Sequence, residues 1–337
     1  MPTFRAAAVT AMLEERAGLQ RVDTDLGRAY VLTQLTGPVA VGDRVLLNTT
    51  AVDLGLGTGG WHVVHWNLAR EEWSEPGPGH LMKLRYTSLQ VDSGAAEEAH
   101  PDLPPHLDGV PVVVCGLHSQ VAVVAAAARG AAPAARITYV MTDGAALPLA
   151  LSDLVVGLRS AGLIDATITA GHAFGGDLEA VSVPAALVLA RHVQGADVIV
   201  VGMGPGVVGT GSPLGTTSVE VAGILDAAAA LGGAPIIALR MSSGDPRPRH
   251  QGLSHHASTA LWLTRSSVTA PVPTGAEVSG LERHHVEVVD PPDVAALLEA
   301  AGLRVTTMGR GPEADELFFR AAGAAGHHAG TLASEQS

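Results

Sequence analysis

The fold of this chain is decided by the stretch from Ala196 to Leu231, ADVIVVGMGPGVVGTGSPLGTTSVEVAGILDAAAAL. It begins with an apolar run, residues 197–201, that is typical of a buried strand. Several glycines follow, and a segment with helical spacing of Ala, Val and Leu ends the stretch. Glycines after a buried strand let the backbone approach a ligand, and the helix behind them directs unpaired N–H groups at it. The stretch therefore predicts a site for a small anionic ligand.

The ligand contacts expected in this stretch come from glycines and hydroxyl groups. The segment Gly204–Gly209 satisfies the pattern G-x-G-x-x-G, which is weak evidence by itself. Pro213 and the lack of an acidic residue at the usual distance argue against a dinucleotide site, and the Gly-Lys-Ser/Thr of a P-loop is missing. A long loop that only packs is the alternative. The predicted ligand-binding residues of the loop are Gly204, Gly206, Gly209, Thr210, Gly211 and Ser212.

The amino-acid composition indicates which kinds of partner and which cellular location to expect. Of the 337 residues 47% are hydrophobic and 3% aromatic, so a sizeable core must be built from Ala, Val and Leu. The net charge of −13 argues against nucleic acid and anionic membrane, because both need a basic surface. A single cysteine, Cys115, excludes a disulfide framework. Without a signal-peptide pattern or a membrane-length apolar run, the chain is expected to be cytoplasmic.

Residues 1–92 have the pattern of a small β-barrel. Short strand candidates at 19–23, 29–33, 44–48 and 61–65 are separated by turn signals, which is typical of a closed or nearly closed barrel. A further strand over 82–91 is expected to return to it. Residues 93–109, rich in Pro, Glu and Ala, are predicted to be the interdomain linker.

Residues 110–326 alternate apolar strands with helices. This pattern predicts an α/β domain with a parallel sheet covered by helices on both faces, and right-handed crossovers make the sheet doubly wound. We expect strands at 110–117, 136–142, 166–173, 198–203 and 235–241, a Pro-rich break at 270–275, and a final β-α-β-α over 285–325 with its second strand at 303–308. Residues 327–337 are expected to form a mobile tail.

Polar residues follow the expected strands, where parallel sheets bind ligands. His118 follows the first strand, Asp143 the second, and His172 and Asp177 the third. The glycine-rich loop follows the fourth strand. After the fifth comes a segment with Arg247 and Arg249, expected to clamp an anion, and with His255 and His256. The predicted catalytic residues are His118, Asp143, His172 and Asp177.

Two chemistries are open at this predicted site. Imidazoles mixed with carboxylates suit a divalent metal such as zinc, manganese or iron, which would activate water. The predicted metal ligands are His172, Asp177, His255 and His256. Without a metal, a histidine would act as general base and the glycine-rich loop as an anion cradle. Structural roles are the alternative, with Asp177 as a helix cap and Asp143 as a turn residue.

Several segments identify a family resemblance. They include Gly42–Thr50, Gly55–Gly60, His80–Tyr86, Tyr139–Gly144, Gly171–Asp177, Gly202–Gly215, Arg249–His256 and Thr307–Arg310. On these segments the chain resembles a bacterial family catalogued as domain of unknown function 3866. The resemblance covers nearly the whole chain and implies that both regions belong to one protein. It assigns no activity, substrate or catalytic residue.

The sequence favours an enzyme, a hydrolase or transferase, that acts on a small anionic molecule. A regulatory protein that binds a nucleotide or another anion without catalysis is the main alternative. A homo-oligomeric assembly protein is the third, and a homo-oligomer is expected because the helix faces are rich in Ala and Gly. The N-terminal domain is expected to close over the site as a lid, with Lys83 or Arg85 contacting the ligand.

Overall fold

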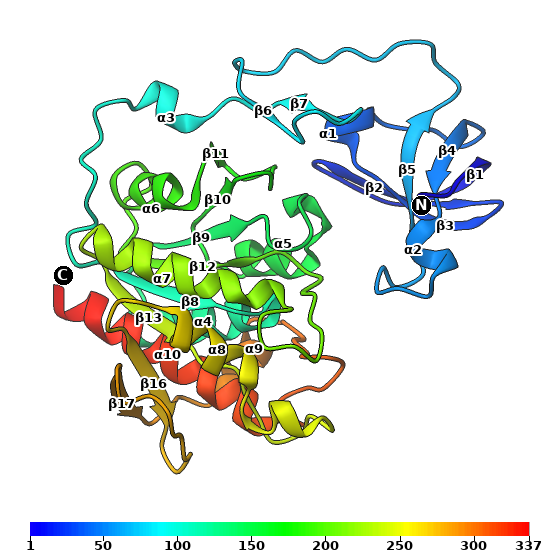
Figure 1. Ribbon diagram of the computed structural model, residues 1–337. Coiled ribbons are helices and arrows are strands. Elements are labelled where there is room, and N and C mark those ends of the chain that lie inside the picture. Colours follow the sequence, from blue (N-terminus) through cyan, green and yellow to red (C-terminus); the bar gives the residue numbers. More distant parts are fainter. Residues whose placement is uncertain (337) are drawn as a thin grey trace. The chain divides into compact units, whose positions relative to one another are not determined.

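The computed structural model describes residues 1–336, and the chain divides into two compact units at Gly94 and Ala95 (Figure 1). The division lies close to the predicted boundary at residue 92. The segment expected as a linker is part of the second unit from Ala95 onward and contains the short helix α3 (Ala96–Ala99). Glu97 accepts a hydrogen bond from the backbone N–H of Val181 at 2.8 Å, which ties this segment to the second unit. Among the described residues, no helix combines the length and the apolar character needed to cross a membrane.

The N-terminal unit contains a closed five-stranded barrel, as predicted, in the order β1-β2-β3-β5-β4. Its strands are β1 (Phe4–Arg16), β2 (Leu19–Thr24), β3 (Gly27–Val31), β4 (Arg44–Asn48) and β5 (His62–Asn67), with the one-turn helices α1 (Thr33–Thr36) and α2 (Thr50–Asp53) between them. Small aliphatic side chains such as Val22, Val45 and Val64 fill the barrel interior. The parallel pairing of β3 with β5 closes it.

The strand expected over 82–91 does not join the barrel. It is broken into β6 (Met82–Lys83) and β7 (Val91–Asp92), which pair only with each other. Leu84 and Tyr86 have φ angles of 51° and 61°, a left-handed conformation that interrupts a strand. Lys83 lies in β6 and is only 4% exposed.

The second unit is built on an eight-stranded sheet, and every strand pair in it is parallel. The order is β11-β10-β9-β12-β8-β13-β16-β17. In chain order the strands are β8 (Pro111–Cys115), β9 (Ile137–Thr142), β10 (Ala166–Ala170), β11 (Leu178–Ala180), β12 (Val198–Met203), β13 (Ala234–Ala238), β16 (Thr269–Pro273) and β17 (His285–Val289). The mixed α/β class and the parallel sheet predicted from the sequence are confirmed.

Helices cover both faces of this sheet (Figure 1). One core contains side chains of α4 (His118–Ala131), α5 (Asp153–Ser160), α9 (Val294–Ala300) and α10 (Glu316–Gln336). The other contains side chains of α6 (Val183–His192), α7 (Glu220–Ala230) and α8 (His255–Leu263). The helices that follow β8 and β9 therefore lie on one face, and the helix that follows β12 lies on the other.

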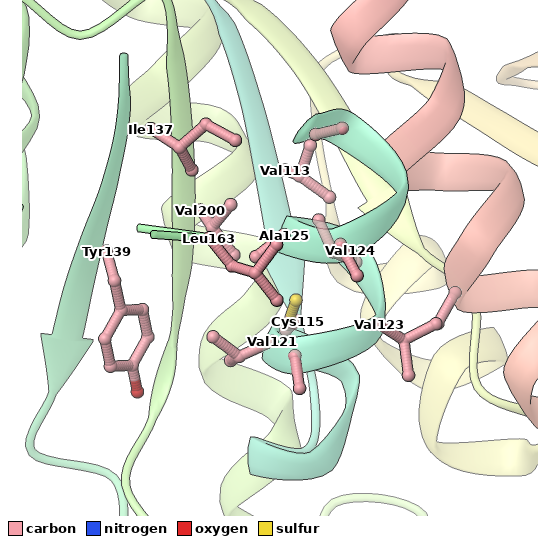
Figure 2. Packing of buried hydrophobic residues seen from close by; sticks show 14 of the residues in the cluster. Val113, Cys115, Val121, Val123, Val124, Ala125, Ile137, Tyr139, Leu163 and Val200 are labelled. Atoms are coloured by element: carbon pink, nitrogen blue, oxygen red, sulfur yellow. The ribbon is translucent and has the colours of Figure 1, made fainter. Parts of the chain in front are cut away.

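The core around α4 is tightly packed from small residues. Figure 2 shows Cys115 of β8 near Val121 of α4, while Val123 points toward α10. Cys115 is fully buried, and burial raises the pKa of its thiol, so it is a core residue and not a nucleophile. Gly326 of α10 lies against the backbone of Val124, where an added Cβ would be 2.8 Å from Cα. The two helices can approach this closely only because glycine stands at the crossing.

Three local predictions in the second unit are wrong. The Pro-rich segment expected as a break is β16, whose ladder to β13 is reduced to the pair Ile236–Thr269, so its prolines cost few hydrogen bonds. Residues 303–308 form no strand. The tail expected to be mobile continues α10 as far as Gln336, and Ala329 and Ala333 are buried in the core.

Candidate functional site

At β12 the chain changes the face of the sheet on which the following helix lies. This strand lies between β9 and β8, yet its helix α7 covers the opposite face from α4 and α5. The chain therefore leaves the neighbouring strands β9 and β12 in opposite directions, and open parallel sheets bind ligands at such points. The glycine-rich loop follows β12 at this point.

The outer part of the glycine-rich loop is a tight hairpin. Thr217 donates its backbone N–H to Val208 O at 2.9 Å, and Thr210 donates to Gly215 O at 2.7 Å. Ser212 donates its N–H to Thr210 Oγ1 at 3.1 Å. These amides are consumed inside the loop. Thr210 and Ser212, predicted to bind the ligand, lie on the exposed tip of the loop, and their backbone N–H groups are used inside it.

The helix behind the loop is also closed to an anion at its first turn. Thr216 Oγ1 accepts from the N–H of Ser218 at 3.3 Å, and α7 then begins with Glu220. A carboxylate in the first turn already interacts favourably with the positive end of the helix dipole. Glu220 would repel a second anion whenever it is ionised, so the helix N-terminus is a poorer anion site than the sequence suggested.

Two glycines of the loop have packing functions. A Cβ at Gly204 would lie 2.6 Å from Ala146 O, so this glycine allows the end of β12 to pass the loop after β9. A Cβ at Gly209 would lie 2.9 Å from Cε1 and 3.2 Å from Nε2 of His256. The missing side chain at Gly209 thus brings the glycine-rich loop against the His255–His256 pair.

Three histidine rings form a cluster beside this contact. His250 ends the 3₁₀ turn Pro248–His250, and His255 and His256 begin α8, whose N-cap is Ser254. The ring centroids are 4.4 to 5.0 Å apart, and the candidate ligand nitrogens lie within 4.8 Å of one another. His250 was not predicted, although it stands in the segment Arg249–His256. The short spacing between His250 and His255 could have indicated a cluster, but this spacing is not a recognised local motif.

A buried arginine fixes the proton of His256. Arg240 Nη1 donates to His256 Nδ1 at 2.9 Å. Because guanidinium has no acceptor, Nδ1 must be the unprotonated nitrogen, and the neutral ring carries its proton on Nε2. That Nε2 and the Nε2 of His255 are buried and have no hydrogen-bond partner among the residues described by the structure.

The three rings are neutral at physiological pH. Burial and then the charge of Arg240 lower the pKa of His256 to about 3. Burial, Arg240 and Arg247 lower the pKa of His250 to about 4, and burial with Arg249 lowers that of His255. The cluster therefore offers uncharged donors and lone pairs inside a cationic environment.

The cations around the cluster are held by two carboxylates. Asp245 is 1% exposed and accepts from Arg247 at 2.9 and 2.8 Å and from Arg310 at 3.2 Å. Asp315 accepts from the N–H groups of residues 243 and 244 and from Arg310. Arg247, predicted as an anion clamp, is thus engaged by Asp245. Arg249 is exposed and stands beside His255.

The predicted metal ligands do not come together. His255 and His256 join His250, whereas Asp177 accepts from Thr167 N–H at 2.8 Å and from Arg159, near the start of β10. The reason is β11, which the sequence did not indicate. The chain runs back after β10 and pairs in parallel with it, so that Asp177 is carried away from the carboxyl edge.

The charge of the histidine cluster does not fit a divalent cation. Arg240, Arg247 and Arg249 lower the pKa values of its rings, and Asp245 is the carboxylate that opposes them at His250. In addition, ligation through His256 Nε2 would require a proton on Nδ1, which faces the donor of Arg240. A positive surplus and a fixed N–H donor favour an anion. A second group of candidate metal ligands, His106, Asp108 and His192, lies before β8 and at the end of α6, apart from the carboxyl edge.

His118 has a positioning function in this structure. A carbonyl only accepts, so His118 Nδ1 donates to Met203 O at 3.0 Å, and Nε2 accepts from Ser152 Oγ at 2.7 Å. Ser152 in turn caps α5 by accepting from Val155 N–H at 3.1 Å. Burial lowers the pKa of His118 to about 4. Both ring nitrogens are used to join β12, α4 and α5, so the predicted catalytic role of His118 is not supported.

Asp143 and His172 lie together at the carboxyl edge, as predicted. Exposed Asp143 accepts from the backbone N–H of His172 at 2.9 Å. Next to them is Glu220, which the sequence did not single out and which accepts from Thr142 Oγ1 at 2.7 Å. Burial, reinforced by the charge of Asp143, raises the pKa of Glu220 to about 7. A carboxyl group poised near neutral pH is suited to general acid or base catalysis.

The raised pKa of Glu220 predicts a pH-dependent effect of Glu220→Gln. Because the folded state keeps the proton longer than the unfolded state, the wild type loses stability as pH rises from about 4.5 through about 7. The variant, which cannot ionise, is expected to match the wild type at pH 4.5 and to be about 1–2 kcal/mol more stable at pH 8.5. Urea denaturation at both pH values measures this, with Glu299→Gln, at an exposed position of α9, as control. A difference that stays constant with pH would contradict it.

A family model described as protein of unknown function (DUF3866) matches residues 28–326. The chain belongs to this family. The match begins in β3 of the barrel and continues through nearly the whole α/β unit, and it confirms the resemblance inferred from the sequence. Searches of curated proteins and of solved structures find no match.

Proposed function

We propose that this protein is an enzyme, a hydrolase or transferase, that acts on a small anionic molecule beside His255 and His256. The observation that carries the proposal is the hydrogen bond from Arg240 to His256 Nδ1. It leaves a buried Nε2–H donor without a partner among the described residues, in a cluster where cations outnumber carboxylates. A buried donor in a cationic environment is costly unless an anion accepts from it.

The same cluster supplies groups for chemistry. Arg249 and the Nε2–H of His256 would stabilise negative charge on the bound anion, and most strongly the charge that develops in a transition state. The neutral ring of His255 could take a proton from an attacking water or hydroxyl group. Glu220 is the second candidate acid or base. Metal-assisted hydrolysis by the four residues predicted from sequence is not proposed, because they are not assembled.

The regulatory alternative would use the same anion site without turnover. We favour an enzyme because several groups that can transfer protons gather near one edge of the sheet. We also propose a homo-oligomer, supported by β17, an edge strand on which Val288 is 67% exposed. We propose a cytoplasmic location as well, supported by the lone buried thiol of Cys115.

Binding of inorganic phosphate tests the proposed site. In calorimetry, Arg249→Ala and His256→Ala are each expected to weaken binding about tenfold, because a charge-assisted hydrogen bond contributes about 1.5–3 kcal/mol. Arg304→Ala, which removes an exposed arginine after α9, is the matched control and should leave affinity unchanged. Hydrolysis of p-nitrophenyl phosphate and p-nitrophenyl acetate by the same variants distinguishes an enzyme from a binding protein. Equal phosphate affinity in all variants would contradict the site.

A further inference from the structure

A groove of about 700 Å³ adjoins the histidine cluster. The tip of the glycine-rich loop contributes Pro213 and Leu214 to it, and the segment leading into α8 contributes Arg249 and Leu253. The volume is within the range of small-molecule sites, which are mostly apolar with a few polar groups that orient the ligand. Arg249 and His255 are the titratable side chains among its lining residues.

Trp262 is the unusual residue of this groove. Its side chain is 68% exposed, although an indole buries well elsewhere in proteins. His255 and Trp262 are seven residues apart on α8, so they lie on the same side of the helix and about 10 Å apart along its axis. One face of α8 therefore presents an imidazole and, two turns later, an exposed aromatic ring.

We infer that this groove binds the aromatic ring of the anionic ligand, and that the ligand is of the nucleoside monophosphate class. The inference rests on the proposed anion site. The phosphate would bind at Arg249 and the histidine cluster, and the base would stack on Trp262 with Pro213 and Leu214 as the opposite apolar surface. A sugar between them has a length that suits the spacing along α8.

Charge and surface type select this ligand over others. An anion without a ring would leave Trp262 and Leu214 exposed, the latter at 59%. An apolar molecule without charge would leave the surplus of arginines unsatisfied. A flat ring can use an open groove because stacking needs only one face, and stacking on an aromatic side chain is worth about 1–3 kcal/mol per base. This arrangement differs from a dinucleotide site, in which the phosphates lie on the helix after the glycines.

Calorimetry with AMP, ribose 5-phosphate and adenosine separates the two parts of the ligand. In the wild type, AMP is expected to bind at least about tenfold more tightly than ribose 5-phosphate, which lacks the ring. Trp262→Ala should abolish this difference by weakening AMP alone, and Trp262→Phe, which keeps a stacking surface, should retain AMP affinity within about threefold. Val288→Ala is the control for removal of an exposed apolar side chain. Trp262 is the sole tryptophan after residue 94, and its fluorescence should respond to AMP.

The outcomes distinguish this inference from the proposed function. Equal affinity for AMP and ribose 5-phosphate, or AMP binding that is unchanged in Trp262→Ala, would overturn the ring site and leave the anion site intact. Adenosine binding as tight as that of AMP would show that the phosphate is not recognised and would overturn the nucleotide assignment. Failure of AMP and of inorganic phosphate to bind would overturn both proposals. Circular dichroism of each variant checks that it is folded. Trp262→Phe serves as a second control, because it keeps an aromatic side chain at this position.

Discussion

Asp245→Ala is expected to lower the free energy of unfolding by about 3–5 kcal/mol. The carboxylate is 1% exposed and accepts hydrogen bonds from Arg247 and Arg310, while Arg240 lies 3.8 Å away. Removing it leaves three guanidinium groups close together without their common counter-ion. An unpaired buried charge costs much more than the pair contributes, because neither water nor a new acceptor can replace the carboxylate.

Urea denaturation at pH 7 measures this loss. The matched control is Glu316→Ala, which removes the carboxylate of an exposed ion pair with Arg320 at 3.8 Å and should change stability by less than about 1 kcal/mol. Similar small effects in both variants would show that the arginine cluster tolerates solvent and would also weaken the argument for an anion site.

Asp245 also predicts the direction of acid sensitivity. Hydrogen bonds from Arg247 hold the pKa of this carboxyl well below its usual range. A depressed pKa contributes stability that is present above the unfolded value of about 4 and is lost as pH falls below it. The advantage of the wild type over Asp245→Ala should therefore shrink progressively as pH falls below about 4, and an advantage that does not shrink between pH 4 and pH 2 would contradict this.

Gly326→Ala is expected to destabilise the α/β unit by about 2–3 kcal/mol. An added Cβ would lie 2.8 and 2.9 Å from the Cα and C atoms of Val124 and would also contact its carbonyl oxygen. These are backbone atoms in the middle of α4, so neither partner can move aside without separating the helices. The substitution therefore forces α10 away from a core that is packed along its length.

Gly223→Ala is expected to change the free energy of unfolding in the opposite direction, although it also replaces a glycine within a helix. Gly223 is exposed in α7, and a Cβ added to it would have no other atom within 4 Å. Alanine has the better helix propensity, so this variant should gain about 0.5–1 kcal/mol. Thermal and urea denaturation of both variants measure the contrast. A gain in both would show that α10 does not pack on α4 at this crossing.

The fold could be predicted because its main signals are local. Apolar runs such as Val198–Val201, alternating with Ala-rich helical segments, require a parallel sheet covered on both faces. The errors arose where tertiary structure overrides local signals. Pro271 and Pro273 are accommodated in β16 because the neighbouring ladder is short, and α10 continues past Ala325 because Ala329 and Ala333 find a core.

The candidate site was predictable only in part, because it depends on strand order and on side-chain direction. The sequence placed His255, His256 and Arg249 at the carboxyl edge, since they follow a strand. It could not show that Asp177 is carried away by β11, or that His118 is engaged at both nitrogens. Nor do Arg240 and Glu220 carry a motif, and their importance comes from burial and from one hydrogen bond each.

The packing of α10 on α4 has a consequence for how the chain is made. β8 and α4 are synthesised early in the α/β unit, whereas α10 follows all eight strands. Until residues 316–336 have left the ribosome, the outer surface of α4 around Val123 and Val124 has no cover, and it is apolar. Nascent chains that pause before α10 would therefore expose the apolar surface of α4. Folding intermediates with exposed apolar surface are prone to aggregate and are bound by chaperones. Slow codons just upstream of residue 316 should reduce the yield of folded protein more than slow codons between the two units.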